Sequence, residues 1–279
     1  MIYTGERFVP DKEISLMALE HMHRYWLAAK YVQNRKCLDI ASGEGYGSAL
    51  LARSAASVVG CDIAPAAVKW AQSRYVKDNL EFMPADITRL GLKDAVFDVI
   101  TCFETIEHIS AAEQKKAIKE LRRVLKNDGL LFISTPSTEL DLHCRHNKFH
   151  KYEMTGKEFF SLLQSEFKYV KFLGQSIYCC SLITAAEGNG NILSFVPEQN
   201  SEIRPEECKY LLAICSNAVL PDFEKVSCCV DRSQNSLRLL TKIRNRVGFV
   251  LPLYNGMIQA LSFLMPSSGL RKSIRRLKW

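Results

Sequence analysis

The sequence predicts an α/β fold in which helices cover both faces of a mostly parallel sheet. Between about residues 35 and 136, short apolar runs of strand length alternate with segments in which apolar residues recur at helical spacing. Strands that alternate with helices along a chain indicate a parallel sheet with covered faces. The hydrophobic content of 47% is typical of a globular protein and can fill a sizeable core.

The expected elements follow one another in a regular order. A helix is expected within residues 20–32, ahead of the first strand. Strands are expected at 36–41, 57–63, 80–87, 97–103, 129–136, 167–178 and 208–217, and helices at 47–54, 65–77 and 111–125. Pro65 marks the start of the second of these helices, and Asn127, Asp128 and Gly129 predict a stop after the third.

The length and charge distribution predict a central domain with two additions. A chain of 279 residues is long for one domain and short for two. We expect an N-terminal helical segment at 1–34, a central domain at 35–220 and a basic helical extension at 221–279. The net charge of +7 is uneven, because residues 231–279 carry +9 and the rest of the chain −2. A nearly neutral body opposes nucleic-acid binding, so no nucleic-acid partner is expected.

The basic extension contains an apolar stretch at residues 247–266. Its length is close to the ~20 residues that span a bilayer, but Pro252, Asn255, Gly256 and Gln259 interrupt it. Three interpretations are open: a spanning helix, an interfacial amphipathic helix, or a helical pair packed on the body or on a partner chain.

The cysteines and the N-terminus predict a cytoplasmic location. The ten cysteines are scattered and none form a CxxC pair, so we expect reduced, buried thiols. The first residues lack the apolar segment of a secretory signal. The basic extension adds the expectation of peripheral docking at the inner, anionic face of the membrane.

Three glycines at alternate positions, Gly43, Gly45 and Gly47, follow the first expected strand. Glycine costs roughly 0.5–1 kcal/mol relative to alanine in regular structure, so we expect a ligand to approach the backbone here. A GxGxxG turn would cradle a phosphate, but this spacing is tighter, and the neighbouring acids Asp39 and Glu44 would repel one. The turn therefore favours a cationic, phosphate-free ligand such as S-adenosylmethionine, and it opposes a nicotinamide dehydrogenase.

Five ordered motifs carry a family resemblance. They are LDIASGEGYG at 38–47, VVGCDIAPAAV at 58–68, PADI at 84–87, FDVITCFETIEH at 97–108 and LRRVLKNDGLLFISTP at 121–136. Together they resemble the class I S-adenosylmethionine-dependent methyltransferases, of the type 11 and ubiquinone-biosynthesis O-methyltransferase kind. The resemblance implies a Rossmann-like sheet of seven strands, mostly parallel, whose last strand inserts antiparallel.

The resemblance also implies how the donor is held. Gly43 and Gly45 would lie against its methionine part, and Asp39 would lie near its ammonium group. Asp62, which ends the second expected strand, would accept both ribose hydroxyls, because one carboxylate can accept two hydrogen bonds.

The adenine end is assigned in the same way. Asp86 would accept the exocyclic amine of the adenine, while Ile63 and Ile87 would sandwich its ring.

An acidic turn after the fourth expected strand presents Glu104, Glu107 and His108. If a helix begins near Glu104, these residues share one face. Such a cluster of acids needs a cation nearby, either the sulfonium of the donor or a divalent metal such as Mg²⁺ with His150 as a fourth ligand. The E-x-x-E-H pattern is similar to that of ubiquinone-biosynthesis O-methyltransferases and small-RNA 2′-O-methyltransferases, which bind a divalent ion there. Unlike the RNA enzymes, this chain has Ile109 where they have a second adjacent histidine.

Two alternatives to the metal site are open. His108 would serve as a metal-free general base, because an imidazole pKa of ~6.5 suits the deprotonation of a hydroxyl. The turn would otherwise be a purely structural helix cap.

The acceptor is expected to be recognised outside the common sheet, by residues 4–32 and 145–160. The words TGERFVP, EHMHRY and FHKYEMT in these segments resemble methyltransferases found with glycosyltransferases in bacterial surface-polysaccharide assembly. The side chains of His21, His23, Arg24 and Tyr25 suit a sugar or its nucleotide carrier. We therefore expect O-methylation of a sugar hydroxyl, with a glycosyltransferase or an anionic membrane as partner. The alternatives are a quinone-like or other phenolic acceptor, and a non-catalytic cofactor-binding scaffold.

Overall fold

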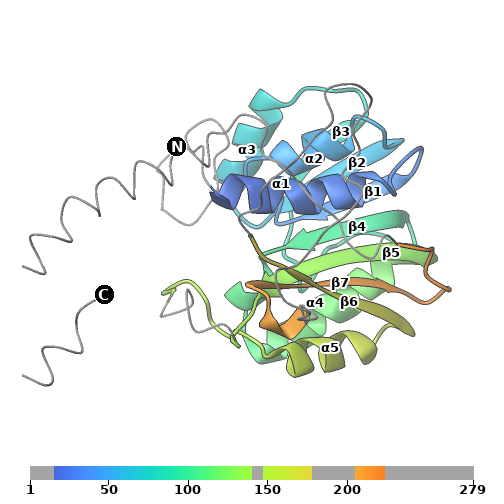
Figure 1. The fold of residues 1–279 in the computed structure, drawn as a ribbon. Coiled ribbons are helices and arrows are strands. Elements are labelled where there is room, and N and C mark those ends of the chain that lie inside the picture. Colours follow the sequence, from blue (N-terminus) through green and yellow to red (C-terminus); the bar gives the residue numbers. More distant parts are fainter. Residues whose placement is uncertain (1–15, 140–146, 178–204, 224–279) are drawn as a thin grey trace, which may run out of the picture. The chain divides into compact units, whose positions relative to one another are not determined.

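The computed structural model describes residues 16–139, 147–177 and 205–223 (Figure 1). All of these from residue 17 onward belong to one compact unit. The expected basic extension beyond residue 223, with its apolar stretch, and the TGERFVP segment lie outside the described residues, so the expected domain boundaries stay predictions.

A seven-stranded sheet forms the centre of the fold, in the order β3-β2-β1-β4-β5-β7-β6. Its strands are β1 Lys36–Ile40, β2 Ser57–Asp62, β3 Leu80–Pro84, β4 Phe97–Phe103, β5 Leu125–Pro136, β6 Tyr169–Gln175 and β7 Tyr210–Ser216. Strands β1 to β5 pair in parallel, whereas β7 runs antiparallel to both β5 and β6. This topology confirms the predicted Rossmann-like sheet and the antiparallel insertion of its last strand.

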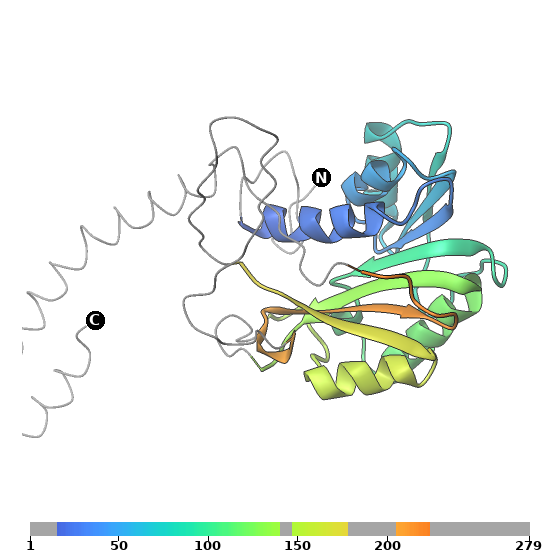
Figure 2. The same cartoon turned by 45° about the vertical axis from the view of Figure 1, so that its right-hand side comes forward.

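Helices cover both faces of this sheet (Figures 1 and 2). They are α1 Leu16–Ala29, α2 Tyr46–Leu51, α3 Pro65–Arg74, α4 Ala111–Val124 and α5 Gly156–Gln164, with short 3₁₀ turns η1 Ile106–His108 and η2 Pro205–Glu207. Successive strand residues point to opposite faces. Cys37 of β1 therefore packs in the cluster with α1, α2 and α3, while Leu38 packs in the cluster with α4 and α5.

The sheet order has a switch point between the neighbouring strands β1 and β4. Strand order reverses between β1 and β4, because β2 and β3 follow on one side and β5 on the other. Ligands of open α/β sheets bind beyond the carboxyl ends of the strands at such a switch point. The glycine turn follows β1, and η1 follows β4, so both lie at this place.

Three local features differ from the sequence-based expectations. Helix α5 was not predicted, although Thr155 and Glu158 form a capping box at its start. Strand β5 begins at Leu125, directly after α4, and includes the expected stop. The turn after β4 forms η1 from Ile106 rather than a helix from Glu104, because Glu104 has a left-handed backbone, with φ of 50°.

In the described part of the chain, no helix combines the length and the apolar character needed to cross a bilayer.

Candidate active site

The glycine turn after β1 contains one glycine that faces open space. Gly43 has φ of +53°, and a Cβ there would meet nothing closer than a backbone oxygen at 3.9 Å. A Cβ on Gly45 would lie 2.8 Å from Ala71 and Phe82, and one on Gly47 would lie 2.0 Å from the Tyr25 ring. Internal packing thus accounts for the last two glycines. The predicted contact of the Gly45 backbone with the donor stays a prediction.

Asp62 lies at the carboxyl end of β2 and holds the glycine turn in place. Its carboxylate accepts hydrogen bonds from the backbone N–H groups of Gly43 at 2.9 Å and Ala64 at 2.8 Å. Each carboxylate oxygen can accept more than one hydrogen bond. The position at the switch point is therefore compatible with the predicted ribose contact, which stays a prediction.

The residues expected at the adenine end differ in exposure. Ile63 is 71% exposed, an unusual environment for a large apolar side chain. Asp86 is also exposed and accepts hydrogen bonds from the backbone N–H and the hydroxyl of Thr88, both at 2.8 Å. Ile87 is only 8% exposed and packs in the core cluster. Of the two isoleucines expected to sandwich the ring, Ile63 alone offers a broad apolar surface.

Asp39 is buried among hydroxyl groups rather than aimed at a ligand. Its side chain has no exposed surface and accepts hydrogen bonds from Ser48 at 2.6 Å, Thr101 at 2.7 Å and Tyr25 at 3.0 Å. Burial raises the pKa of Asp39 to about 6, although the three hydroxyls favour its charged form. The carboxylate has no exposed surface for direct contact with a ligand, and its predicted place near the donor's ammonium group stays a prediction.

Arg24 supplies the cation that the acidic turn requires. It lies on α1, is 1% exposed, and its Nη1 is 2.7 Å from Glu104 Oε1 and 3.1 Å from Ser134 Oγ. Ser134 also donates to the same carboxylate at 2.7 Å. Sequence reasoning predicted a cation near Glu104 but assigned Arg24 to the acceptor. The two residues are 80 positions apart, so no local pattern could have paired them.

Two buried polar atoms near the switch point lack a partner among the described residues. They are Arg24 Nη2 and Ser42 Oγ, which belongs to the turn after β1. Buried polar atoms in proteins nearly always have a hydrogen-bond partner, and exceptions often mark ligand sites. The guanidinium N–H suits an anionic group and the hydroxyl suits a polar one. Both atoms therefore fit the carboxylate-bearing amino-acid end of the expected donor.

Two other α1 residues expected at the acceptor, Tyr25 and His21, form hydrogen bonds within the protein. Tyr25 is 4% exposed and bonds to Asp39. The ring of His21 bonds through Nδ1 to the Tyr46 hydroxyl at 2.8 Å. Burial, aided by the positive charges of Arg24 and Lys209, lowers the pKa of His21 to about 3, so this ring is neutral. These hydrogen bonds hold Tyr25 and His21 within the protein, and their expected role in sugar binding stays a prediction.

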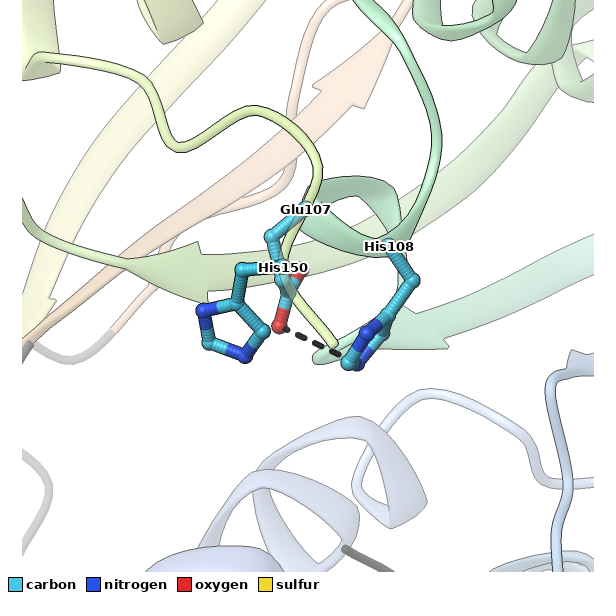
Figure 3. Close-up of side chains that lie close together, drawn as sticks. All are labelled: Glu107, His108 and His150. Atoms are coloured by element: carbon cyan, nitrogen blue, oxygen red, sulfur yellow. Dashed lines mark ion pairs between the residues drawn. The ribbon is translucent and has the colours of Figure 1, made fainter. Parts of the chain in front are cut away.

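Three of the four residues expected to hold a metal lie together beyond the ends of β4 and β5. Figure 3 shows Glu107, His108 and His150 with their side chains converging, and one ligand atom from each lies within 4.8 Å of the others. Glu104 is not part of this group, because its carboxylate pairs with Arg24. The predicted ligand set is therefore corrected by the loss of Glu104.

Glu107 is the buried member of this cluster. It is 1% exposed, and Thr135 donates to its Oε2 at 3.2 Å. Burial, followed by the nearby charge of Glu104, raises the pKa of Glu107 well above its ordinary value. His108 Nε2 lies 4.0 Å from Glu107 Oε1, and His108 Nδ1 lies 3.2 Å from the Phe149 carbonyl, so Nδ1 carries the proton. Nε2 is then the ring nitrogen that faces Glu107.

Backbone contacts fix the loop that carries His150 against η1. The N–H groups of Lys151 and Tyr152 donate to the Glu107 carbonyl at 2.8 and 3.2 Å. The Gln114 side chain donates to the carbonyls of Ile106 and Tyr152 at 2.9 and 3.0 Å. This confirms that the loop after β5 returns over the same strand ends, as the sequence predicted.

The donor set fits a divalent transition ion better than Mg²⁺. Two imidazoles and one carboxylate suit zinc, iron or manganese, whereas magnesium prefers oxygen ligands alone. A buried carboxyl group with a raised pKa is also one that a cation would stabilise in its charged form.

Comparisons with known proteins agree with the fold and the glycine turn. Residues 38–133 match the family described as "Methyltransferase domain". The "Probable S-adenosylmethionine-dependent methyltransferase Rv3030" of Mycobacterium tuberculosis is 37% identical over 164 residues, 57% of this chain and 58% of the relative. The "Ubiquinone biosynthesis O-methyltransferase" of Coxiella burnetii is 29% identical over 149 residues, 52% of this chain and 60% of the relative. The chain thus spans less than two thirds of these curated relatives.

A solved structure supports the same architecture. One chain of the complex between the Haloferax volcanii Trm112 methyltransferase activator and a methyltransferase superposes with a TM-score of 0.53 at 16% identity. The superposition covers 73% of this chain and 92% of that one, which shows a shared fold. The seven-stranded topology, the glycine turn at the switch point and the family match over 38–133 together support a class I S-adenosylmethionine-dependent methyltransferase domain in this part of the chain.

Proposed function

We propose that this chain transfers a methyl group from S-adenosylmethionine to a hydroxyl oxygen. The observation that supports this best is the cluster of Glu107, His108 and His150 beside the switch point. It gathers groups that can weaken or remove a hydroxyl proton beyond the end of β4, next to the strand that carries the glycine turn.

The donor would be held by groups from both sides of the switch point. Gly43 leaves space for its methionine part, and Arg24 Nη2 offers an N–H to its carboxylate. Asp62 would accept the ribose hydroxyls, and Ile63 would cover one face of the adenine. None of these proposed contacts involves a phosphate group, which agrees with the acidic residues around the turn.

The methyl transfer is a single nucleophilic displacement at the methyl carbon. A lone pair of the acceptor oxygen forms a bond to the methyl carbon, and the bond from this carbon to sulfur breaks, with its electrons leaving on the sulfur. The acceptor proton would pass to water if a bound cation lowers the hydroxyl pKa, or to His108 Nε2 if no cation is bound. Alignment of the two reactants accounts for much of the acceleration in such reactions, up to ~7–11 kcal/mol in well-oriented systems.

We assign Glu107, His108 and His150 to a divalent cation that orients the acceptor and lowers its hydroxyl pKa. Chelation tests this assignment. Turnover should fall after treatment with a chelator and return on addition of Mn²⁺. Turnover that is indifferent to chelation would remove the cation and leave His108 Nε2 as the base that takes the proton.

The proposed acceptor is a sugar hydroxyl in a cell-surface glycan or its precursor, because the words in residues 4–32 and 145–160 resemble enzymes of that kind. A second candidate is a phenolic, quinone-like acceptor, favoured by the similarity to a protein named for ubiquinone biosynthesis. Transfer of a labelled methyl group to nucleotide sugars and, in parallel, to catechol-type phenols separates the two. Donor binding without transfer to either class would favour a non-catalytic scaffold.

A further inference from the structure

We propose that Glu153 is a positioning residue that fixes the His150 ring with Nε2 facing the cluster. This inference rests on the cation site of the proposed function. Glu153 belongs to the same loop as His150, three residues further along, and was not singled out by any sequence pattern.

The contacts of His150 define its tautomer. Nδ1 of the ring bonds to the Glu153 carboxylate, and a carboxylate can only accept, so Nδ1 carries the proton. Nε2 bonds to Asn147 Nδ2 at 2.8 Å, and an amide nitrogen can only donate, so Nε2 carries the lone pair. The two assignments agree with each other. The tautomer of the His150 ring is therefore defined from both sides.

The same arrangement holds the other imidazole. His108 bonds through Nδ1 to the Phe149 carbonyl, as His150 bonds through Nδ1 to Glu153. The two rings meet edge to face, with centroids 4.9 Å apart. In both histidines a protein oxygen thus holds Nδ1, which leaves Nε2 as the nitrogen that could bind a cation. Metal-binding histidines almost always show this pattern, and the oxygen partner orients the ring and raises its basicity.

Burial makes the Glu153 contact specific. The side chains of His150 and Glu153 are only 14% and 18% exposed, so solvent competes weakly for the hydrogen bond. Asn147, in contrast, is exposed, and a cation at Nε2 would take the place of its amide hydrogen. Glu153 would remain in place when this exchange occurs.

The test is calorimetric titration of the full chain with Mn²⁺. Glu153→Ala should weaken Mn²⁺ binding about 10–100-fold, the usual cost of removing such an oxygen partner. Glu153→Gln keeps an oxygen that can accept from Nδ1, so it should retain much of the affinity. The control Glu81→Gln removes an exposed carboxylate from β3 and should change nothing. Unchanged affinity for S-adenosylmethionine in each variant shows that the fold is intact.

Two further readouts separate positioning from a general structural role. In a His150→Ala background, Glu153→Ala should cost no further affinity, because its effect passes through the ring. In the metal-free protein, a long-range ¹H–¹⁵N spectrum should show the His150 proton on Nδ1, and Glu153→Ala should move part of it to Nε2.

The outcomes are distinguishable. Equal Mn²⁺ affinity of wild type and Glu153→Ala, or equal loss in the His150→Ala background, would overturn the role of Glu153 alone. A wild-type chain that binds the methyl donor but no Mn²⁺ would overturn the cation site of the proposed function, and this inference with it.

Discussion

Asp39 and Asp62 lie on neighbouring strands and both precede the bends that shape the site, yet their carboxylates have different surroundings. Asp39 is enclosed by the hydroxyls of Tyr25, Ser48 and Thr101. Asp62 accepts from two backbone N–H groups at the end of β2. Asp39 is thus enclosed within the protein, whereas Asp62 lies at the end of a strand beside the switch point.

We expect Asp62→Ala to weaken binding of S-adenosylmethionine about 10–100-fold. The reason is the loss of charge-assisted hydrogen bonds, which contribute roughly 1.5–3 kcal/mol. Calorimetry with the donor and its homocysteine product measures the effect. The exposed Asp78 offers a matched control, because Asp78→Ala also removes one carboxylate. Equal affinities for the two variants would contradict the ribose contact.

Asp39 should make stability depend on pH. Its pKa is about 6 in the folded protein and 3.8 without the fold, so the folded state binds the proton more tightly between these values. Stability is therefore lost through this group as pH rises from about 4 to 6, by at most about 3 kcal/mol. Urea unfolding of wild type and Asp39→Asn at pH 4 and pH 7 measures it. The stability of wild type relative to the variant should fall over this range, and a constant difference would refute the prediction.

At the scale of elements, the glycine turn and its flanking strand ends combine packing with access. Gly45 and Gly47 let α2 lie close to Phe82 and Tyr25, whereas Gly43 keeps one side of the turn open. Glu104, at the end of the neighbouring β4, also has a left-handed backbone. Unfavourable backbone conformations of this kind concentrate at functional sites, where the surroundings hold them in place.

Substitutions of Gly47 and Gly43 should therefore affect different quantities, the first mainly stability and the second mainly donor affinity. Gly47→Ala places a Cβ against the buried Tyr25 ring and should cost about 1–3 kcal/mol of unfolding free energy. The added methyl group of Gly43→Ala would meet no side chain and would instead project into the space proposed for the donor. This variant should therefore lower donor affinity more than Gly47→Ala does. Urea unfolding and calorimetry on both variants provide the two measurements. The reverse order in donor affinity would contradict the assignment of Gly43 to the open side.

At the scale of the whole molecule, polar side chains of α1 contact strands on both sides of the switch point. Glu20, Arg24 and Tyr25 on this helix are all nearly fully buried. Glu20 contacts Lys209 and Tyr210 at the start of β7, Arg24 contacts the ends of β4 and β5, and Tyr25 contacts β1. Buried charges are costly unless paired. The buried charged residues of α1 therefore suit a polar ligand bound beside this helix.

We expect the basic extension to bind anionic membranes. Residues 231–279 carry a charge of +9, and each basic residue near an anionic surface contributes about 1 kcal/mol. Co-sedimentation with phosphatidylglycerol vesicles should be strong for the full chain, fall with added salt and be lost on deletion of 231–279. Neutral vesicles serve as the control. A deleted chain that sediments equally well would leave a glycosyltransferase or another protein as the candidate partner.

Local sequence patterns predict the order of all seven strands and of helices α1 to α4. All seven strands lie where apolar runs predicted them, and the positions of Gly43 and Asp62 at strand ends followed from the same pattern. Burial repeats along a strand or helix with a regular period, so local sequence contains this information. Helix α5 was missed although its Thr155 and Glu158 capping box is visible in the sequence.

Contacts between side chains that are far apart in the sequence become visible in the folded structure alone. In the fold, Arg24 forms an ion pair with Glu104, and Asp39 is fully buried. His150 lies beside Glu107 and His108. Periodicity shows that a residue faces inward, but it does not show which partner it finds there. That partner depends on strand order and on the path of the loops, and these are set by the packing of the whole domain.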